Sequence, residues 1–104
     1  MAITKTDAVV ALRSDSKSLS MAYLYILNCA DDTLYIGWTT NLDRRLHQHN
    51  AGRASRYTRA RLPVRLVYWE QHPDRSSAMR REVELKRLPR AEKLRLIHTT
   101  EGQS

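Results

Sequence analysis

Residues 23–37 decide the fold, and they read YLYILNCADDTLYIG. Residues 23–27 and 34–37 are short runs of aromatic and branched side chains, which are typical of buried β-strands. Asp31 and Asp32 lie between the two runs, and aspartate favours turns because its side chain bonds to the nearby backbone. The stretch therefore predicts an antiparallel hairpin.

Two tyrosines of this hairpin occupy chemically informative positions. If Asp31 and Asp32 form the turn, residues whose numbers sum to about 60 face each other, so Tyr25 and Tyr35 lie across from one another or nearly so. The pair is either ordinary aromatic core or a functional pair of phenols. Gly37 ends the second run, where it permits a close backbone approach or an unusual dihedral angle.

A helix is predicted over residues 41–50, with Asn41 as its cap and its end near Gly52. Its apolar stripe, at the spacing i, i+4, i+7, is Leu42, Leu46 and His49. Arg45 borders this stripe, whereas Arg44 lies on the opposite, solvated side. Arg45 can therefore reach over the sheet, either as a structural partner of a carboxylate or as a functional group. His49 is by default a packed, hydrogen-bonded imidazole.

The rest of the chain is predicted to contain one strand and two helices, after a basic segment. The basic segment 53–61 has room for one helical turn, and Pro63 ends it. A strand is predicted at 64–69, a helix from Asp74 to about residue 88, and a last helix from about residue 90 to 98. The order β-β-α-β-α-α predicts the α/β (α+β) class, with a three-stranded sheet covered by helices.

A carboxylate falls on the apolar face of the helix that begins at Asp74. Five side chains form one broad arc, namely Ala78, Met79, Val83, Leu85 and Leu88. Glu82 lies near the middle of this arc, whereas Glu84 points the other way. Burying a carboxylate is costly unless a cation compensates it, so we expect Glu82 to meet an arginine, Lys86 or a metal ion. A structural ion pair and a functional site both remain open.

Length and composition limit the organisation of the chain. Its 104 residues suffice for one small domain, which we place at residues 21–98, between a disordered extension at 1–20 and a C-terminal tail at 99–104. Met21 is an alternative start. No apolar run could span a bilayer and no secretory signal opens the chain, so we expect a cytoplasmic protein without a membrane partner, and a monomer by default. The single cysteine, Cys29, excludes an internal disulfide and a cysteine-based zinc site.

The charge pattern favours a polyanionic partner. The net charge is +7, and residues 44–69 contain seven arginines and no acid. The guanidinium fork suits bidentate contacts to phosphate, so the pattern points to a nucleic acid. Arg53, Arg56, Arg59 and Arg61 would follow the phosphate backbone and Tyr57 would stack on an exposed base. A solvated basic loop without a ligand is the alternative.

Taken together, these residues resemble the GIY-YIG endonuclease domain, in particular its small stand-alone bacterial members. Residues 23–25 stand in the place of the first signature triplet, with Tyr23 and Leu24 instead of glycine and isoleucine, and residues 35–37 reproduce the second. Residues 41–49 are similar to the helix with the family's essential arginine, which falls on Arg45, and with a histidine or tyrosine one turn later, which falls on His49. Residues 78–86 are similar to the helix with the metal-binding glutamate, which falls on Glu82. The resemblance implies a central three-stranded antiparallel sheet flanked by helices.

The resemblance also implies a reaction, the hydrolysis of a phosphodiester. Glu82 would hold one Mg²⁺ or Mn²⁺, and Arg45 would bind the scissile phosphate. Tyr25 would be the general base, since Arg45 and the metal would lower the pKa of its phenol. Tyr35 would orient water or phosphate, and His49 could carry the proton. Gly37 and Lys86 complete the set of residues expected to contact nucleic acid.

The expected substrate is DNA more than RNA, recognised by structure or strandedness because no second domain is available to read a sequence. A substrate of this kind implies a role in DNA repair. The main alternative is a non-catalytic nucleic-acid-binding module with the same fold. A protein-interaction adaptor would need an exposed apolar patch, and the polar faces of the predicted helices offer none.

Overall fold

Strand β1, Ala22–Asn28, is the central strand of a three-stranded sheet. The computed structural model describes residues 21–102, so the predicted extension at 1–20 lies outside the described residues. Strands β2, Leu34–Thr39, and β3, Arg65–His72, flank β1 in the order β2-β1-β3, and both pair antiparallel to it. The predicted α/β (α+β) class and the antiparallel sheet are confirmed.

The hairpin register is centred on Asp31, in a turn where Asp32 has a φ of 67°. Tyr25 therefore faces Gly37, and Tyr35 faces Leu27. The two tyrosines are diagonal neighbours instead of direct partners, with ring centroids 6.4 Å apart. Tyr25 and Gly37 share one face of the sheet.

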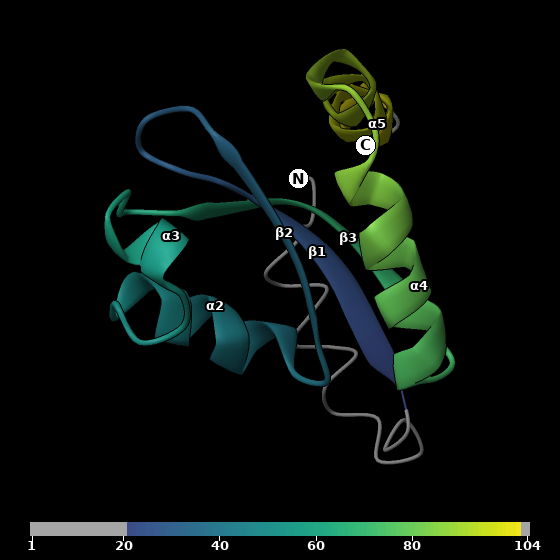
Figure 1. Ribbon diagram of the computed structural model, residues 1–104, viewed down its shortest axis with the longest axis horizontal. Coiled ribbons are helices and arrows are strands. Elements are labelled where there is room, and N and C mark those ends of the chain that lie inside the picture. Colours follow the sequence, from purple (N-terminus) through teal and green to yellow (C-terminus); the bar gives the residue numbers. More distant parts are fainter. Residues whose placement is uncertain (1–20, 103–104) are drawn as a thin grey trace.

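Helices cover both faces of the sheet (Figure 1). Helices α2, Leu42–Asn50, and α3, Arg56–Arg59, lie on one side, and α4, Arg75–Lys86, and α5, Arg90–Gly102, lie on the other. The Asn41 side chain caps α2 by accepting from the Arg44 backbone N–H, and the Asp74 side chain caps α4 by accepting from that of Ser77. Helix α5 continues to Gly102, so the predicted tail at 99–104 is helical over residues 99–102.

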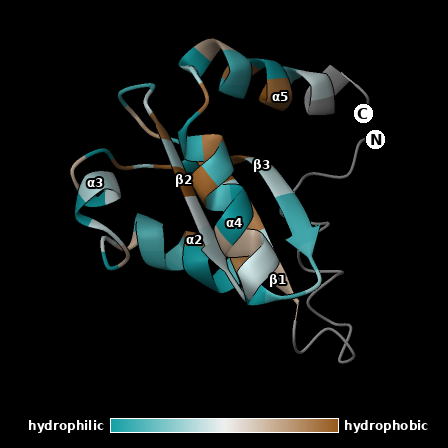
Figure 2. Ribbon diagram, turned by 45° about the vertical axis from the view of Figure 1, so that its right-hand side comes forward, coloured by the Kyte–Doolittle hydropathy of each residue, from teal (hydrophilic) through white to brown (hydrophobic). Residues whose placement is uncertain are grey.

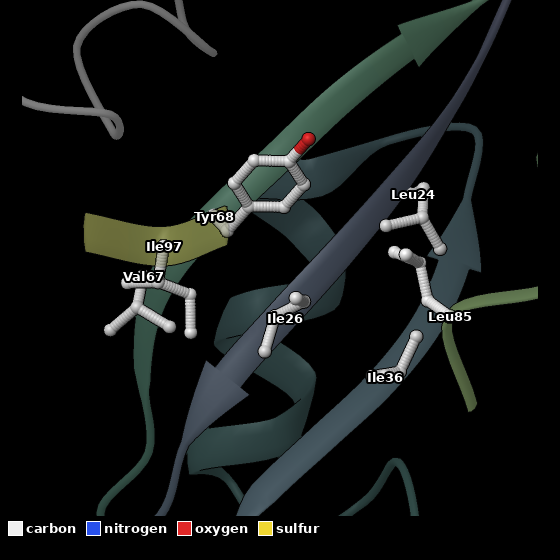
Figure 3. Packing of buried hydrophobic residues seen from close by; sticks show 7 residues of the cluster. All are labelled: Leu24, Ile26, Ile36, Val67, Tyr68, Leu85 and Ile97. Carbon is white, nitrogen blue, oxygen red and sulfur yellow. The ribbon is translucent and has the colours of Figure 1, made fainter. Parts of the chain in front are cut away.

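Side chains of β1 alternate between two hydrophobic clusters. Tyr23, Tyr25 and Leu27 pack with Leu42 on the α2 side. Leu24 and Ile26 face the other way, where they belong to the cluster of Figure 3 together with Ile36, Val67, Tyr68, Leu85 and Ile97. This alternation follows from the two-residue period of a strand.

Two residues of the predicted apolar arc on α4 lie outside the core. Met79 and Val83 are each 48% exposed, whereas Ala78 and Leu85 are buried. In Figure 2, α4 alternates between hydrophilic and hydrophobic residues, while α2 is almost entirely hydrophilic. The prediction that Met79 and Val83 belong to a core-facing arc is therefore wrong. Within the described residues, no helix is long and apolar enough to cross a membrane.

Candidate active site

Tyr25, His49 and Thr58 form a chain of hydrogen bonds inside the protein. Oη of Tyr25 lies 2.9 Å from Nε2 of His49, and Nδ1 of His49 lies 2.8 Å from Oγ1 of Thr58. The Thr58 hydroxyl donates to the backbone carbonyl of Ser55 at 3.3 Å. Only 2% of Tyr25 is exposed, and His49 and Thr58 are fully buried. One residue each from β1, α2 and α3 therefore meets in a closed, polar line.

The hydrogen bond from Thr58 to Ser55 favours one tautomer of His49. A hydroxyl has a single hydrogen, and Thr58 gives its hydrogen to Ser55, so Oγ1 accepts from Nδ1–H of His49. Nε2 is then the unprotonated nitrogen, and it accepts the phenolic hydrogen of Tyr25. The phenol oxygen keeps lone pairs with which it can accept a hydrogen bond from the Arg45 side chain.

Burial dominates the titration of both rings. Burial raises the pKa of Tyr25 to about 12, whereas a hydrogen bond from the Arg45 side chain and the charge of Arg45 act to lower this pKa. The charges of Tyr35 and Glu82 add smaller upward contributions. Burial, and then the charge of Arg45, lower the pKa of His49 to about 4. Both groups are therefore neutral at pH 7. The downward effect of Arg45 on Tyr25 agrees in direction with the expectation, but burial outweighs it.

Gly37 makes room for the Tyr25 phenol. A Cβ atom at position 37 would lie 2.6 Å from Oη and 2.8 Å from Cζ of Tyr25, which is closer than carbon atoms normally approach. The predicted close approach at Gly37 therefore exists, but its partner is a side chain of the same protein. Tyr35 is half-buried beside this pair, with its ring centroid 5.2 Å from that of His49.

Arg45 extends from α2 over the same face. Its Nη1 donates to Oε1 of Gln48 at 3.3 Å, while its buried Nε has no hydrogen-bond partner among the described residues. Buried donors are normally satisfied, so this nitrogen is a place where an acceptor such as a phosphate oxygen would be favoured. No ion pair between Arg45 and Glu82 occupies it, and the structural pairing left open above is not formed.

Glu82 instead pairs with Lys86, one of the partners expected for it. Oε2 of Glu82 lies 3.5 Å from Nζ of Lys86, whose side chain is 56% exposed, against 22% for Glu82. An exposed pair of this kind is weak, typically below about 1 kcal/mol, so the carboxylate can exchange its partner. Glu82 is near enough to Tyr25 for its charge to raise the pKa of the phenol.

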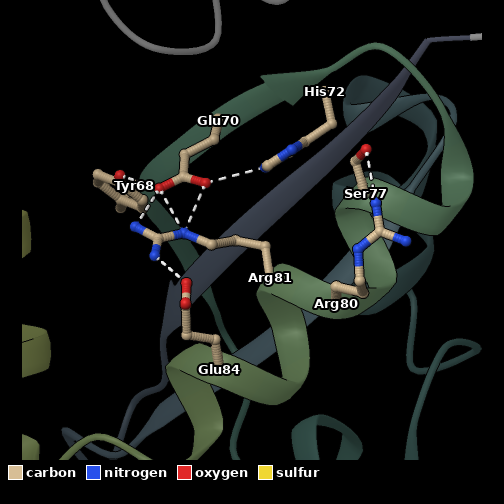
Figure 4. Close-up of polar contacts among 7 residues, drawn as sticks. All are labelled: Tyr68, Glu70, His72, Ser77, Arg80, Arg81 and Glu84. Atoms are coloured by element: carbon tan, nitrogen blue, oxygen red, sulfur yellow. Dashed lines mark hydrogen bonds and ion pairs between the residues drawn. The ribbon is translucent and has the colours of Figure 1, made fainter.

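The neighbour of Glu82 anchors α4 to the sheet (Figure 4). Nε and Nη2 of Arg81 donate to the Glu70 carboxylate on β3 at 2.9–3.1 Å, and Tyr68 and His72 also bond to that carboxylate. Burial acts to raise the pKa of Glu70, but these hydrogen bonds outweigh it and hold the pKa below its usual value. The anchor fixes the helical turn that carries Glu82.

The predicted basic segment divides into two parts. Arg53, Arg56 and Arg59 are exposed. Arg61 is engaged within the protein, because its Nε lies 3.0 Å from Oδ2 of Asp31, its Nη1 donates to the Tyr57 carbonyl, and its guanidinium lies 3.9 Å from the Tyr57 ring centroid. The Tyr57 ring also stacks on Tyr35. These internal contacts make Arg61 and Tyr57 poorer candidates for phosphate and base contacts than predicted.

Four of the predicted residues thus lie together, namely Tyr25, Tyr35, Arg45 and His49. Glu82 is close enough to influence the Tyr25 phenol electrostatically. Thr58 was missed by sequence reasoning. The signal for it is faint: Ser55 stands three residues earlier, at the spacing of a helix cap. No group of three or more histidine, cysteine or acidic side chains suited to a metal occurs among the described residues.

Comparison with known proteins identifies the family of the chain. Residues 21–95 match the family model of the GIY-YIG catalytic domain. A UPF0213 protein of Natronomonas pharaonis is 51% identical over 80 residues, which are 77% of this chain and 94% of that protein. A UPF0213 protein of Syntrophus aciditrophicus is 48% identical over 80 residues, covering 76% of this chain and 92% of that protein.

A solved structure shows the same fold. The solution NMR structure of a UPF0213 protein from Bacillus halodurans has a TM-score of 0.51 at 43% identity, covering 76% of this chain and 84% of that chain. The family match spans the sheet, the helix with Arg45 and His49, and the helix with Glu82. The chain therefore belongs to the GIY-YIG catalytic domain family, whose domain is of the nuclease type.

Proposed function

We propose that this protein is a metal-dependent endonuclease that hydrolyses phosphodiester bonds in structured or single-stranded DNA. One observation carries the proposal: Tyr25 donates a hydrogen bond to His49 Nε2, beside Arg45, whose buried Nε has no hydrogen-bond partner among the described residues. A proton acceptor and an anion-binding group thus stand together, as phosphodiester hydrolysis requires.

Arg45 binds the scissile phosphate in this proposal, and its guanidinium stabilises the negative charge that gathers in the transition state. Tyr25 accepts a proton from the attacking water while its own phenolic proton passes to His49 Nε2. A phosphate on Arg45 neutralises the charge that contributes to the low pKa of His49, so substrate binding makes His49 a better proton acceptor. Tyr35 lies beside both rings and orients the water or the phosphate.

Glu82 is the residue that would hold a divalent cation. Magnesium keeps several waters and takes only one or two protein carboxylates, so a half-buried carboxylate with one weak partner fits it. When bound, Mg²⁺ or Mn²⁺ supplies charge stabilisation to the reacting oxygens. Lys86 would have to release the Glu82 carboxylate for a cation to bind there.

The decisive experiment incubates the protein, with and without Mg²⁺ or Mn²⁺, with labelled single-stranded, nicked, flapped and branched DNA and with matched RNA. We expect cleavage only with metal. Glu82→Gln and Arg45→Ala should each lower the rate by about 10²–10³-fold. Glu84→Gln is the matched control, because Glu84 lies on the same helix and is 63% exposed.

Two results would contradict the proposal. Cleavage that survives Glu82→Gln would show that the carboxylate has no part in the reaction. Salt-sensitive binding without cleavage under any metal condition would favour the other candidate, a non-catalytic nucleic-acid-binding module. That reading has one observation on its side, the burial of the Tyr25 phenol.

A further inference from the structure

A basic hollow of about 300 Å³ opens beside the candidate active site, and we call it the Trp38 hollow. Trp38 comes from the end of β2, Arg44 and Arg45 from α2, and Arg75 is the first residue of α4. Figure 1 shows that the end of β2 and the starts of α2 and α4 lie at the same, lower end of the molecule. Arg45 thus borders both the hollow and the Tyr25 phenol.

The charge of the hollow is one-sided. Three guanidinium groups line it, and no carboxylate is among the lining residues. Like charges that line one hollow repel one another, so an anion that bridges them is favoured. Guanidinium groups from two different helices can contact one phosphate from two directions, through bidentate hydrogen bonds.

Trp38 adds an aromatic surface to this basic wall. Tryptophan in a short strand normally contributes its large apolar area to the core. Trp38 is half-buried, yet it belongs to neither of the two hydrophobic clusters of the described residues. An indole and three guanidiniums in one hollow suit a ligand that carries both a planar ring and a phosphate, and a nucleotide has both.

We propose that the Trp38 hollow binds one unpaired nucleotide of the substrate strand, adjacent to the phosphate held by Arg45. The base lies against the Trp38 indole, and the flanking phosphate bonds to Arg44 and Arg75. The hollow is at the lower limit of the volumes of small-ligand sites, about 300 Å³, so it takes a single nucleotide and not a duplex. The inference rests on the proposed function and names its substrate class: a strand with an unpaired nucleotide next to the cleavage position.

A fluorescence titration in EDTA tests the site without any cleavage. The chain has two tryptophans, so Trp69→Phe leaves Trp38 as the only one. The probes are single-stranded oligodeoxyribonucleotide, the matched blunt duplex, single-stranded RNA of the same sequence, and inorganic phosphate. We expect single strands to quench Trp38 saturably and at lower concentration than the duplex, with no quenching by phosphate. Comparison of DNA with RNA shows whether the site distinguishes the sugar.

Binding of a labelled single strand, followed by anisotropy, provides a second measurement with Trp69 unchanged. Trp38→Ala should weaken binding about ten-fold, and Trp38→Phe, which keeps an aromatic ring, should recover most of it. Arg75→Gln should reduce the slope of log K against log[salt] by about 0.7, the value for one lost phosphate contact on a single strand. Arg87→Gln, at the other end of α4, is the matched control. It should leave unchanged the preference of the protein for single strands over the duplex.

The inference is overturned if Trp38→Ala binds single strands as tightly as the unchanged protein, or if blunt duplex quenches Trp38 as strongly as single strands. Its failure is distinguishable from failure of the proposed function, because no step of the binding assay needs metal or hydrolysis. Quenching by single strands in a protein that never cleaves would support the hollow and reject the endonuclease. Cleavage of flapped or single-stranded DNA by an unimpaired Trp38→Ala variant would support the endonuclease and reject the hollow.

Discussion

The phenol of Tyr25 donates a 2.9 Å hydrogen bond to His49 in a region closed to solvent, and Thr58 holds the far side of the same imidazole. Three residues separated by up to 33 positions in the chain thus share one line of hydrogen bonds. The unprotonated nitrogen of His49 faces Tyr25 only because the other nitrogen has Thr58 as its acceptor.

Thr58→Val keeps the shape of the side chain and removes the hydroxyl. We expect Nδ1 of His49 to lose its acceptor, which costs about 1–3 kcal/mol of stability and lets the two neutral tautomers mix. The ¹⁵N shifts of the imidazole report the tautomer directly, and cleavage should fall about ten-fold. Thr58→Ser is the control, since it retains the hydroxyl. A Thr58→Val protein that keeps the Nδ1–H tautomer and full activity would refute the positioning role.

Acid should destabilise the fold through His49. Its pKa is about 4 in the folded protein, against an unperturbed value of 6.5, so the unfolded chain binds more protons between these two pH values. Stability is therefore retained above about pH 6.5 and decreases as pH falls towards 4, by at most about 1.4 kcal/mol per pH unit for this one proton. Urea unfolding at a series of pH values measures the slope. The slope should become smaller in His49→Gln, and an unchanged slope would place the titrating group elsewhere.

Gly37→Ala should displace the Tyr25 phenol. A new Cβ would lie 2.6 Å from Oη of Tyr25, so either the ring or strand β2 has to move, at a cost of about 1–3 kcal/mol. We expect the hydrogen bond to His49 to weaken and cleavage to be lost. Gly52→Ala is the matched control: its φ of 75° makes alanine costly, but the nearest atom to the new Cβ is 3.6 Å away. Equal activity losses in the two variants would contradict the specific role of position 37.

Arg56 and Arg61 lie five positions apart in one basic segment and should behave differently. Arg56 is exposed, so Arg56→Gln should weaken nucleic-acid binding and flatten its salt dependence with little effect on stability. Arg61 is held by Asp31 and the Tyr57 carbonyl, so Arg61→Gln should lower stability by about 1 kcal/mol and leave the salt slope nearly unchanged. Thermal unfolding and binding at several salt concentrations separate the two effects.

Local periodicity was enough to predict the strands and the helix with Arg45 and His49. It did not predict that Met79 and Val83 are exposed. A rotation of 100° per residue relates the side chains of a helix to one another, but it does not say which side of the helix faces the sheet. The hydrogen bonds between Arg81 and Glu70 set that direction. They join residues on different elements, and no spacing along the chain reports such a contact.

The same limit explains why Thr58 and the Trp38 hollow were missed. Thr58 meets His49 only after α3 folds back on α2, and the hollow needs residues from β2, α2 and α4 together. The expected partner of Tyr25 was two residues from the observed one, because the turn is centred on Asp31 and places Gly37, and not Tyr35, opposite Tyr25. Local patterns thus predicted the candidate groups, and tertiary contacts determined how they are supported.

Strand β1 gives its odd-numbered side chains, from Tyr23 to Leu27, to the α2 layer, and Leu24 and Ile26 to the α4 layer. The hydrogen bond between Tyr25 and His49 and the bulk of the aliphatic packing therefore lie on opposite faces of the sheet. Substitutions that refill the aliphatic side could therefore raise thermal stability while Tyr25, Arg45 and His49, on the α2 side, stay unchanged.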